Sequence, residues 1–389
     1  MNVLFLTHSF PRDDGDAAGS FVLRLARALV SEKVSVRVVA PGATGLASQE
    51  DMDGVPVDRF RYAPRRYETL AYGGNMAAQV RDSWSARFTL VGFLGAEFQA
   101  GVRARREFQP DIVHAHWWFP NGLAATWVAR MGHIPLVTTL HGTDVRMARN
   151  IPMSRPAFRH VMQHSAAVTA VSRWLSEEAQ GIVSMKPPIV APMPVATELF
   201  VASAGAPRQR RLLFVGRLMP QKGIDLLIDA LAALPDDIGL DVVGDGPDRA
   251  ALEARALAAG VGTRVRFHGA VKQFELAAFY QRALALVVPS SEEGLGLVAV
   301  EAQLCETPVV AFDSGGLPDV IQHDRTGILV RERSASALAA AVQSLLARDD
   351  QGAALGAAGR LHALATFAPE SVAKRYADIY RSVLEHHAP

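Results

Sequence analysis

The chain has 389 residues, of which 49% are hydrophobic and 20% charged, and its formal net charge at pH 7 is +1. This composition argues against a disordered or membrane-spanning chain, because it supplies a packed core but no apolar run of the roughly 18 residues that a spanning helix needs. The small charge excludes a general attraction to nucleic acid, and the length favours two domains over one.

The first residues and the cysteine content indicate a compartment. MNVLFLTHSF lacks the basic leading region and the small-residue cleavage site of a signal peptide, and it fits a buried strand better. The single cysteine, Cys305, excludes an internal disulfide and a cysteine-based zinc site, as is usual in a reducing cytoplasm. We therefore expect a cytoplasmic protein.

Short apolar strands alternate with helical stretches through the first half of the chain. The expected strands are 3–7, 34–41, 111–116, 135–142 and 167–172. Apolar side chains recur at helical spacing over 20–30, between the first two strands. This alternation is typical of a parallel sheet with helices on both faces, and it predicts a first domain over residues 1–195.

Residues 59–106 form a strongly basic region. Nine arginines stand against three acids there, an excess of six positive charges, and eight aromatic residues are interleaved with them. Basic residues alternating with aromatic rings suit the surface of an anionic membrane, at whose inner face the protein would then be peripheral. A solvated helical face with its own core contacts has the same pattern, so both interpretations stay open.

The alternation restarts after a run of prolines and small residues at 184–209, which predicts an interdomain linker. Strands are expected at 211–216 and 240–246, each followed by a helix. The sequence thus predicts a second α/β domain over 196–370. The last helix, within 371–389, has an apolar stripe left over after the second sheet is complete, and we expect it to pack back on the first domain.

In open parallel sheets ligands bind beyond the carboxyl ends of the strands, so the loops there are the places to look. In FVGRLMPQKG, Gly216 permits close backbone approach, and Arg217 and Lys222 lead into a helix. Two cations beside the unpaired NH groups of a helix start suit a pyrophosphate. The alternative interpretation is a solvent-exposed loop that binds no ligand, since loops with one arginine and one lysine are often of that kind.

A second loop, PSSEEGLGLVAVEA, carries two carboxylates eight residues apart, Glu293 and Glu301. Glu301 would lie about one turn inside a helix and face the same cleft as Glu293, where carboxylates accept hydrogen bonds from vicinal hydroxyls of a sugar. The alternative is a helix-start charge and a surface charge. Gly315 and Gly316 form another tight loop, compatible with phosphate binding or with a plain turn.

In the first domain, His141 stands just past a strand end, with Asp144 three residues later. A histidine at such a position is often exposed to solvent and has no catalytic role. A position across the cleft from the glycine loops would make it catalytic instead.

The second half of the chain contains, in this order, the motifs GRL…KG, VVGDGP, PSSEEGLG…EA and GGLP. Together they resemble the motifs of retaining glycosyltransferases of the GT4 family. Members of that family have the GT-B fold, in which two Rossmann-like domains face a central cleft. The resemblance implies that Glu293 binds hydroxyls of the donor sugar and Glu301 the ribose. It implies that Arg217 and Lys222 hold the diphosphate. Backbone contacts would come from Gly294, Leu295 and Gly296, while Gly19 would lie beside the diphosphate and His141 near the reacting end of the sugar.

The sequence departs from the family pattern at three places. Asp16 and Ala17 stand where paired glycines are common, so the path of the first loop is open. PMPVATELF replaces the usual sequence after the linker strand, and Leu295 replaces the motif phenylalanine.

The expected function is therefore retaining transfer of a hexose-type sugar from a nucleotide-diphosphate sugar, with no cofactor and no metal, since no Asp-x-Asp pair falls in these loops. We expect same-face attack, with Asp144 as the fallback nucleophile. A nucleotide-sugar epimerase and a non-catalytic binding module are the alternatives. The sugar, the base and the acceptor stay open, although Trp117, Trp118 and Phe119, with 59–106, favour a lipid-linked or cell-envelope glycan acceptor.

Overall fold

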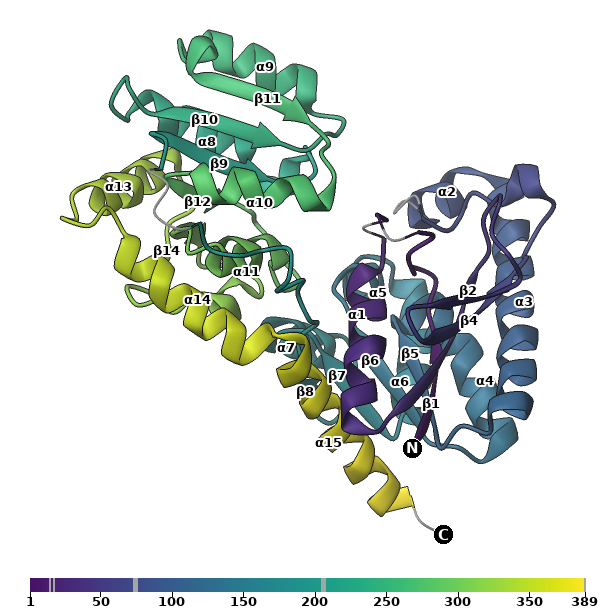
Figure 1. The fold of residues 1–389 in the computed structure, drawn as a ribbon. Coiled ribbons are helices and arrows are strands. Elements are labelled where there is room, and N and C mark those ends of the chain that lie inside the picture. The colour runs from purple at the N-terminus through teal and green to yellow at the C-terminus, as the bar shows by residue number, and fades with distance from the viewer. Residues whose placement is uncertain (14, 17, 73–75, 204–207, 388–389) are drawn as a thin grey trace. The chain divides into compact units, whose positions relative to one another are not determined.

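The computed structural model describes residues 1–387 other than 14, 17, 73–75 and 204–207. The chain divides into two compact units, coloured by residue number in Figure 1. Unit 1 contains Met1–Pro194 and the C-terminal segment that starts at Pro369, and unit 2 contains Val195–Ala368. Part of the expected linker, residues 204–207, lies outside the described residues.

Unit 1 is built on a sheet with strand order β3-β4-β2-β1-β5-β6-β7-β8. Its strands are β1 (Asn2–Leu6), β2 (Ser35–Pro41), β3 (Gln49–Met52), β4 (Val55–Phe60), β5 (Ile112–His116), β6 (Leu136–Leu140), β7 (Ala167–Ala170) and β8 (Ile189–Val190). All neighbours are parallel except β3 and β4. The central strands β5 and β6 are buried along their whole length, as expected for strands of a parallel sheet that is covered on both faces.

Helices cover both faces of this sheet. They are α1 (Ser20–Leu29), α2 (Met76–Asp82), α3 (Trp84–Phe108), α4 (Leu123–Gly132), α5 (Thr143–Asn150), α6 (Arg155–His164), α7 (Arg173–Ile182) and α15 (Pro369–His387). Figure 1 shows α1 and α15 on one side of the sheet and α3 and α4 on the other. The core between the sheet and α3 and α4 contains Leu4, Leu6, Phe93 and Val128.

The last helix, α15, belongs to unit 1 although it follows unit 2 in the chain. Its apolar stripe, which includes Val372 and Val383, is buried. The Tyr380 hydroxyl lies 2.7 Å from His114 Nδ1 of β5, so a polar contact also fixes the helix to the sheet. A helix that buries such a stripe contributes to the core of the unit on which it packs.

Unit 2 contains a six-stranded sheet, all of whose neighbours are parallel, in the order β11-β10-β9-β12-β13-β14. Its strands are β9 (Arg211–Val215), β10 (Gly239–Val243), β11 (Val265–Gly269), β12 (Ala285–Val288), β13 (Val309–Phe312) and β14 (Ile328–Val330). Its helices are α8 (Ile224–Ala232), α9 (Arg249–Ala258), α10 (Gln273–Arg282), α11 (Leu297–Leu304), α12 (Leu317–Val320), α13 (Ala335–Leu346) and α14 (Ala353–Phe367). One core joins α8, α9 and α13 to the sheet, and α10 and α14 contact α11.

The predicted fold class, two α/β domains with parallel sheets, is confirmed. The proline-rich segment differs from its prediction. Ile189–Val190 forms strand β8 beside β7, and Ala191 and Met193 are buried, so this part of the expected linker completes the first sheet. The prolines are compatible with this because a short edge strand needs few backbone donors.

Candidate functional site

The strand order of unit 2 fixes where its ligand site should lie. Numbered by their order in the chain, the strands lie in the order 3-2-1-4-5-6, so the strand order reverses between the first and fourth strands, β9 and β12. Such sheets bind ligands in the crevice beyond the carboxyl ends of these two strands. The loops that follow β9 and β12 are those with Lys222 and Glu293.

Glycines bring these loops into backbone contact. Gly223 has a φ of 65°, and a Cβ added to it would lie 2.1 Å from the carbonyl oxygen of Pro289. A Cβ on Gly315 would lie 2.4 Å from the carbonyl oxygen of Glu293, and Gly316 donates its NH to that same oxygen at 2.8 Å. The glycines are therefore needed because any side chain would push the loops after β9, β12 and β13 apart.

The loop after β10 joins the same cluster. A Cβ on Gly244 would lie 1.9 Å from the carbonyl oxygen of Gly216, and one on Gly246 would lie 2.2 Å from that of Leu218. Leu218 also donates its NH to the backbone of Asp245 at 2.9 Å. The predicted glycine loops are thus close together at one end of the sheet.

Lys222 and Glu293, which are 71 residues apart in the chain, form an ion pair at this end. Lys222 Nζ lies 2.5 Å from Glu293 Oε1, and their side chains are 20% and 13% exposed. Ser290 donates its hydroxyl to the same oxygen at 2.9 Å. Both contacts use Oε1, and the described residues provide no hydrogen bond to Oε2. Oε2 and the remaining ammonium protons are the groups that a ligand can bind.

Arg217 lies in the same loop as Lys222, but its side chain is exposed. Its guanidinium makes no hydrogen bond or ion pair to the described residues. An exposed arginine beside a mostly buried lysine is available to an anion that enters from solvent.

Glu301 is the fifth residue of α11, as its spacing from Glu293 predicts. It is buried, and the Tyr280 hydroxyl donates to its Oε2 at 2.8 Å. Burial, and then the Glu301 charge, raises the pKa of Tyr280 well above its ordinary value and that of Cys305 to about 12. Tyr280 was not anticipated as a partner, because a tyrosine in an amphipathic helix gives no signal of the carboxylate that it contacts.

The start of α11 is shaped by its glycine. Gly296 is the residue before the helix and has a φ of 94°, which other residues rarely adopt. Leu295 is buried, so it contributes packing and leaves polar contacts at this position to its backbone. Gly294 and Gly296 flank it on a loop that ends in a helix N-terminus, an arrangement that suits phosphate oxygens.

Unit 1 has a corresponding reversal between β1 and β5. Gly19, the residue before α1, has a φ of 70°, and a Cβ there would lie 2.1 Å from the carbonyl oxygen of Ser9. This close approach holds the loop after β1 against the start of α1, so Gly19 lies at the end of the sheet where a ligand is expected. Asp16 is described, whereas Ala17 lies outside the described residues.

His141 belongs to a buried group of rings at the same end of unit 1. It stacks on Trp117 with ring centroids 4.1 Å apart, and its Nε2 lies 3.2 Å from His116 Nδ1. Burial, reinforced by the charges of His116 and His8, lowers the pKa of His141 well below its ordinary value. The ring is therefore neutral at pH 7 and interacts through hydrogen bonds and not through positive charge.

His8 and Asn121 were not predicted to act together. Asn121 Nδ2 lies 2.9 Å from His8 Nδ1, and burial lowers the pKa of His8 to about 4. The signal for this pair was the position of both residues just after the strands that flank the reversal, β1 and β5.

Asp144 organises the loop that contains His141. Its carboxylate accepts backbone NH groups of Trp118, His141, Gly142 and Val145 at 2.9–3.2 Å. Burial raises its pKa to about 6 despite these hydrogen bonds. A buried carboxylate with four hydrogen bonds is poorly suited to nucleophilic attack.

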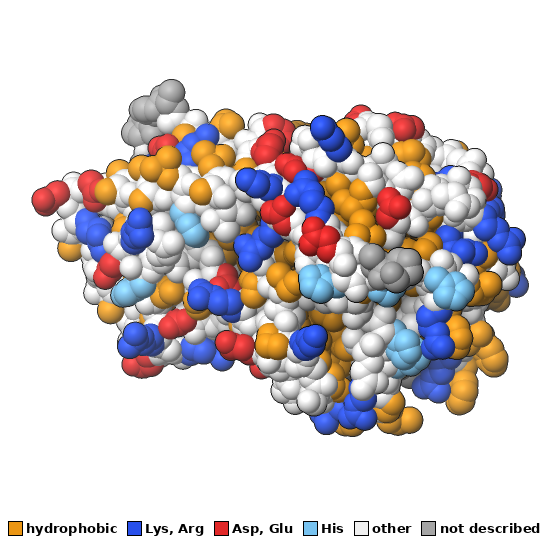
Figure 2. Space-filling model, turned by 90° about the horizontal axis from the view of Figure 1, so that it is seen from below, with side chains coloured by type: hydrophobic (Ala, Val, Ile, Leu, Met, Phe, Trp, Pro, Cys, Tyr) orange, Lys and Arg blue, Asp and Glu red, His pale blue; other side chains and the backbone are white. Residues whose placement is uncertain are grey.

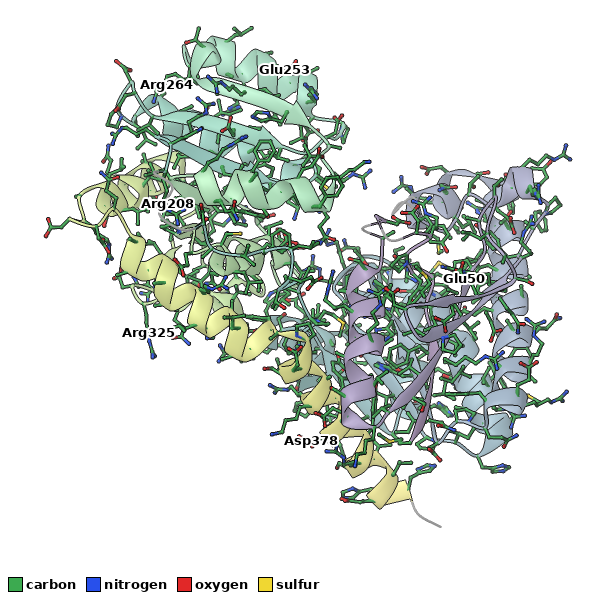
Figure 3. The ribbon with its side chains drawn as sticks, viewed as in Figure 1. Glu50, Arg208, Glu253, Arg264, Arg325 and Asp378 are labelled. Atoms are coloured by element: carbon green, nitrogen blue, oxygen red, sulfur yellow. The ribbon has the colours of Figure 1, made fainter. Side chains whose placement is uncertain are left out.

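The basic stretch 59–106 is not one surface. Arg59 is buried, and its guanidinium contacts Glu50 of β3, labelled in Figure 3, at 2.6 Å. Tyr62 and Phe93 are buried as well, so much of the stretch is core. On the face in Figure 2, basic and acidic side chains are intermixed, in keeping with the small net charge. Only parts of the stretch, among them Trp84, Arg87 and Phe88, are exposed.

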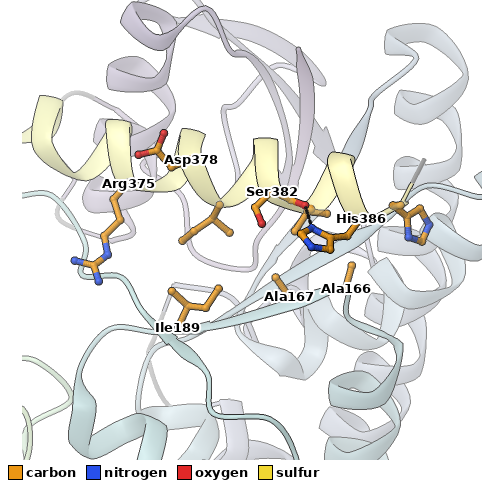
Figure 4. Close-up of a pocket in the computed structure, with 10 residues that line it drawn as sticks. Ala166, Ala167, Ile189, Arg375, Asp378, Ser382 and His386 are labelled. Carbon is orange, nitrogen blue, oxygen red and sulfur yellow. Dashed lines mark hydrogen bonds between the residues drawn. The ribbon is translucent and has the colours of Figure 1, made fainter.

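A pocket of about 590 Å³ in unit 1 lies apart from these residues, between α15 and the starts of β7 and β8 (Figure 4). Arg375, Asp378, Ser382 and His386 line it. Since Ala167, which lines it, is the first residue of β7, the pocket lies at the amino end of the sheet, opposite the predicted site residues of unit 1. No helix among the described residues is long and apolar enough to cross a membrane.

Both units are similar in sequence to known glycosyltransferases. The model of the glycosyl transferase 4-like domain matches residues 17–195, and that of glycosyl transferases group 1 matches residues 196–362. The D-inositol 3-phosphate glycosyltransferase of Xylanimonas cellulosilytica is 32% identical, with 96% of this chain and 94% of the relative covered. The chain belongs to the GT4 family of glycosyltransferases. The GT4 resemblance and the two-domain GT-B fold that the motifs implied are thereby confirmed.

Two further matches extend this GT4 assignment. The GDP-mannose-dependent alpha-(1-6)-phosphatidylinositol monomannoside mannosyltransferase of Mycobacterium tuberculosis is 31% identical, with 72% of this chain and 79% of the relative covered. The structure of Anabaena HepE in complex with UDP and glucose matches with a TM-score of 0.72 at 19% identity, covering 98% of this chain and 100% of that one. At that identity the structural match bears on the GT-B fold alone.

Proposed function

We propose that this GT4 glycosyltransferase moves a hexose-type sugar, with retention of configuration, from a nucleotide-diphosphate sugar to a glycan or lipid-linked acceptor. The observation that carries the donor assignment is the Lys222–Glu293 pair at the strand-order reversal of unit 2. It presents a cation and a carboxylate oxygen side by side, as a ligand with both a diphosphate and sugar hydroxyls requires.

Each predicted residue has a role in this proposal. Lys222 and Arg217 bind the diphosphate and stabilise its charge as the bond to the sugar breaks. Glu293 Oε2 accepts hydroxyl protons of the sugar, while Glu301, held by Tyr280, accepts those of the ribose. The phosphate and the sugar are contacted by backbone groups of Gly216, Gly294, Leu295 and Gly296. In unit 1, we assign Gly19 to the diphosphate and His141 to the reacting end of the sugar.

Retention by same-face attack is the mechanism we favour. Double displacement needs a carboxylate free to attack, and Asp144 is buried with four backbone hydrogen bonds. In same-face attack, a phosphate oxygen of the donor takes the proton of the acceptor hydroxyl while Lys222 and Arg217 balance the charge of the leaving diphosphate.

Two cations supply the charge that a divalent metal provides in other phosphate sites, so we propose that turnover needs no metal. Activity measured with and without EDTA tests this directly. Unchanged rates are expected, and loss of activity that added Mg²⁺ or Mn²⁺ restores would contradict it.

The acceptor assignment is supported by the relatives. The names of two of them contain an inositol phosphate and a phosphatidylinositol monomannoside, and both compounds bear phosphate. We propose a phosphate-bearing glycan or glycolipid as acceptor, met in the cytoplasm at the inner face of the membrane.

The test is a transfer assay with labelled UDP-, GDP- and ADP-sugars, with and without acceptor, followed by NMR of the anomeric linkage. The proposal expects a product whose anomeric configuration matches the donor. An inverted linkage would refute retention. Conversion of the donor sugar without any acceptor would favour an epimerase, and binding without transfer or hydrolysis would favour a binding module.

A further inference from the structure

The outward face of α3 has an unusual composition. With about 100° between successive residues of a helix, positions 84, 88, 91, 95, 98 and 102 fall within a stripe of roughly ±40°. Trp84, Phe88 and Val91 in this stripe are 73%, 75% and 70% exposed. Phe98 and Val102 are half-buried, and with Met131 they line a surface pocket of about 470 Å³.

The opposite face of the same helix packs against unit 1. It contains Ala86, Phe93, Ala100 and Ala104, all buried. A helix that covers a core normally presents polar residues to solvent, so apolar residues on both faces indicate that the outer face has a second apolar environment. In Figure 1, α3 lies at the outer edge of unit 1, along nearly its whole height.

Cations border this apolar stripe. Exposed arginines lie before, beside and at the end of α3, namely Arg65, Arg66, Arg87, Arg103 and Arg106. The acids nearest in sequence to the two ends of the helix, Asp82 and Glu107, form ion pairs with Arg81 and Arg37. The face therefore combines exposed aromatic rings with unbalanced positive charge.

The rings and the cations are also in direct contact. The Arg87 guanidinium lies 4.4 Å from the ring centroid of Trp84, and that of Arg66 lies 4.7 Å from the ring of Tyr67. Arg66 and Tyr67 share a pocket of about 490 Å³ with Ser83 and Ser85 at the start of α3. The Asp82 carboxylate also lines this pocket, and its charge is balanced by the ion pair with Arg81. Hydroxyls and a guanidinium around one hollow suit the phosphate of a lipid headgroup.

We propose that the outer face of α3, defined by Trp84, Phe88 and Val91 with Arg66 and Arg87, docks on a membrane of anionic lipid. The helix lies in the plane of the interface, with its rings at the level of the acyl boundary and its arginines among the headgroup phosphates. Charge complementarity selects an anionic bilayer over a neutral one. The role of this surface in bringing the enzyme to its acceptor rests on the proposed function, whereas the docking itself is measured without substrate.

The test is sedimentation of the full chain with vesicles of phosphatidylcholine alone or mixed equally with phosphatidylglycerol. The proposal expects binding only to the anionic vesicles, weakened by salt, with a blue shift of tryptophan fluorescence. Trp84→Ser with Phe88→Ser should weaken binding by about tenfold or more. The matched control is Leu257→Ser with Leu361→Ser, which removes two side chains of similar exposure in unit 2 and should leave binding unchanged.

Unfolding temperatures of both variants verify that each remains folded. Equal binding of the Trp84/Phe88 variant and its control, or failure of the native chain to bind anionic vesicles, would overturn the proposal. A dimer that dissociates on the Trp84/Phe88 change, without vesicle binding, would assign the face to a second copy of this chain instead. Donor-induced thermal protection, measured in parallel, reports separately on the proposed function.

Discussion

At the scale of single residues, the site depends on a charge pair that is mostly removed from solvent. Each of Lys222 and Glu293 stabilises the charge of the other. If one of them were removed, the charge that remains would keep part of its desolvation cost without the ion pair that offsets it. The pair holds both groups in place before a ligand arrives. Preorganised charge of this kind is a large source of transition-state stabilisation.

Replacing Lys222 with alanine removes the cation expected to balance the leaving diphosphate. We expect kcat/KM to fall by about 10²–10³-fold, as for loss of one preorganised donor. Lys374→Ala, at an exposed position of α15, is the control and should be without effect. Steady-state kinetics with the identified donor measures both, and comparable rates for the two variants would remove Lys222 from the proposed role.

Glu97 of α3 gives a prediction about stability and pH. It is fully buried, neither carboxylate oxygen has a hydrogen bond to a described residue, and burial raises its pKa well above the ordinary value. Its contribution to stability is complete below the unfolded pKa of about 4.5 and is lost as the pH rises through the folded pKa, at about 1.4 kcal/mol per pH unit.

Glu97→Gln cannot ionise, so the fall in unfolding free energy between pH 5 and the folded pKa should become shallower in this variant. Urea unfolding at a series of pH values measures the slope. The same pH dependence in the variant and the native chain would show that Glu97 does not titrate in this range.

At the scale of elements, the sequence predicts the two parallel sheets because their strands are short, apolar and separated by helical stretches. It also predicts the loops after β9 and β12, since Gly216, Lys222 and Gly296 stand at strand or helix ends. It does not predict β8, because two residues between prolines carry no periodicity and pair only through β7. The Tyr280–Glu301 contact depends on how α10 packs, which no local pattern encodes. The His8–Asn121 contact is signalled only by the positions of the two residues after β1 and β5.

The glycine contacts between loops make a prediction at this scale. Gly315→Ala would place a Cβ against the backbone of Glu293 at a φ of 57°, so we expect a loss of about 1–3 kcal/mol of unfolding free energy and weaker donor binding. Gly181→Ala, in helix α7 with open space around it, is the control and should stabilise by about 0.5–1 kcal/mol. Denaturant unfolding of both variants tests the contrast, and equal effects would refute it.

At the scale of the whole molecule, unit 2 is continuous in sequence while unit 1 is completed by α15. Removal of residues 369–389 takes away buried side chains such as Tyr376 and Tyr380 and leaves the Nδ1 atom of His114 without the Tyr380 hydroxyl. We expect unit 1 to unfold at a lower temperature while unit 2 keeps its transition. Calorimetry resolves the two transitions, and an unchanged transition of unit 1 would show that α15 contributes little to its core.

We propose that the loops of unit 2 around Lys222 and Glu293 bind a nucleotide-diphosphate sugar. Titration calorimetry of the full chain with UDP-, GDP- and ADP-sugars tests it most directly. We expect saturable binding of at least one of them, weakened by about tenfold or more in Lys222→Ala and unchanged in Lys374→Ala. Absence of binding by the native chain, or equal affinity in the Lys222 variant, would contradict it.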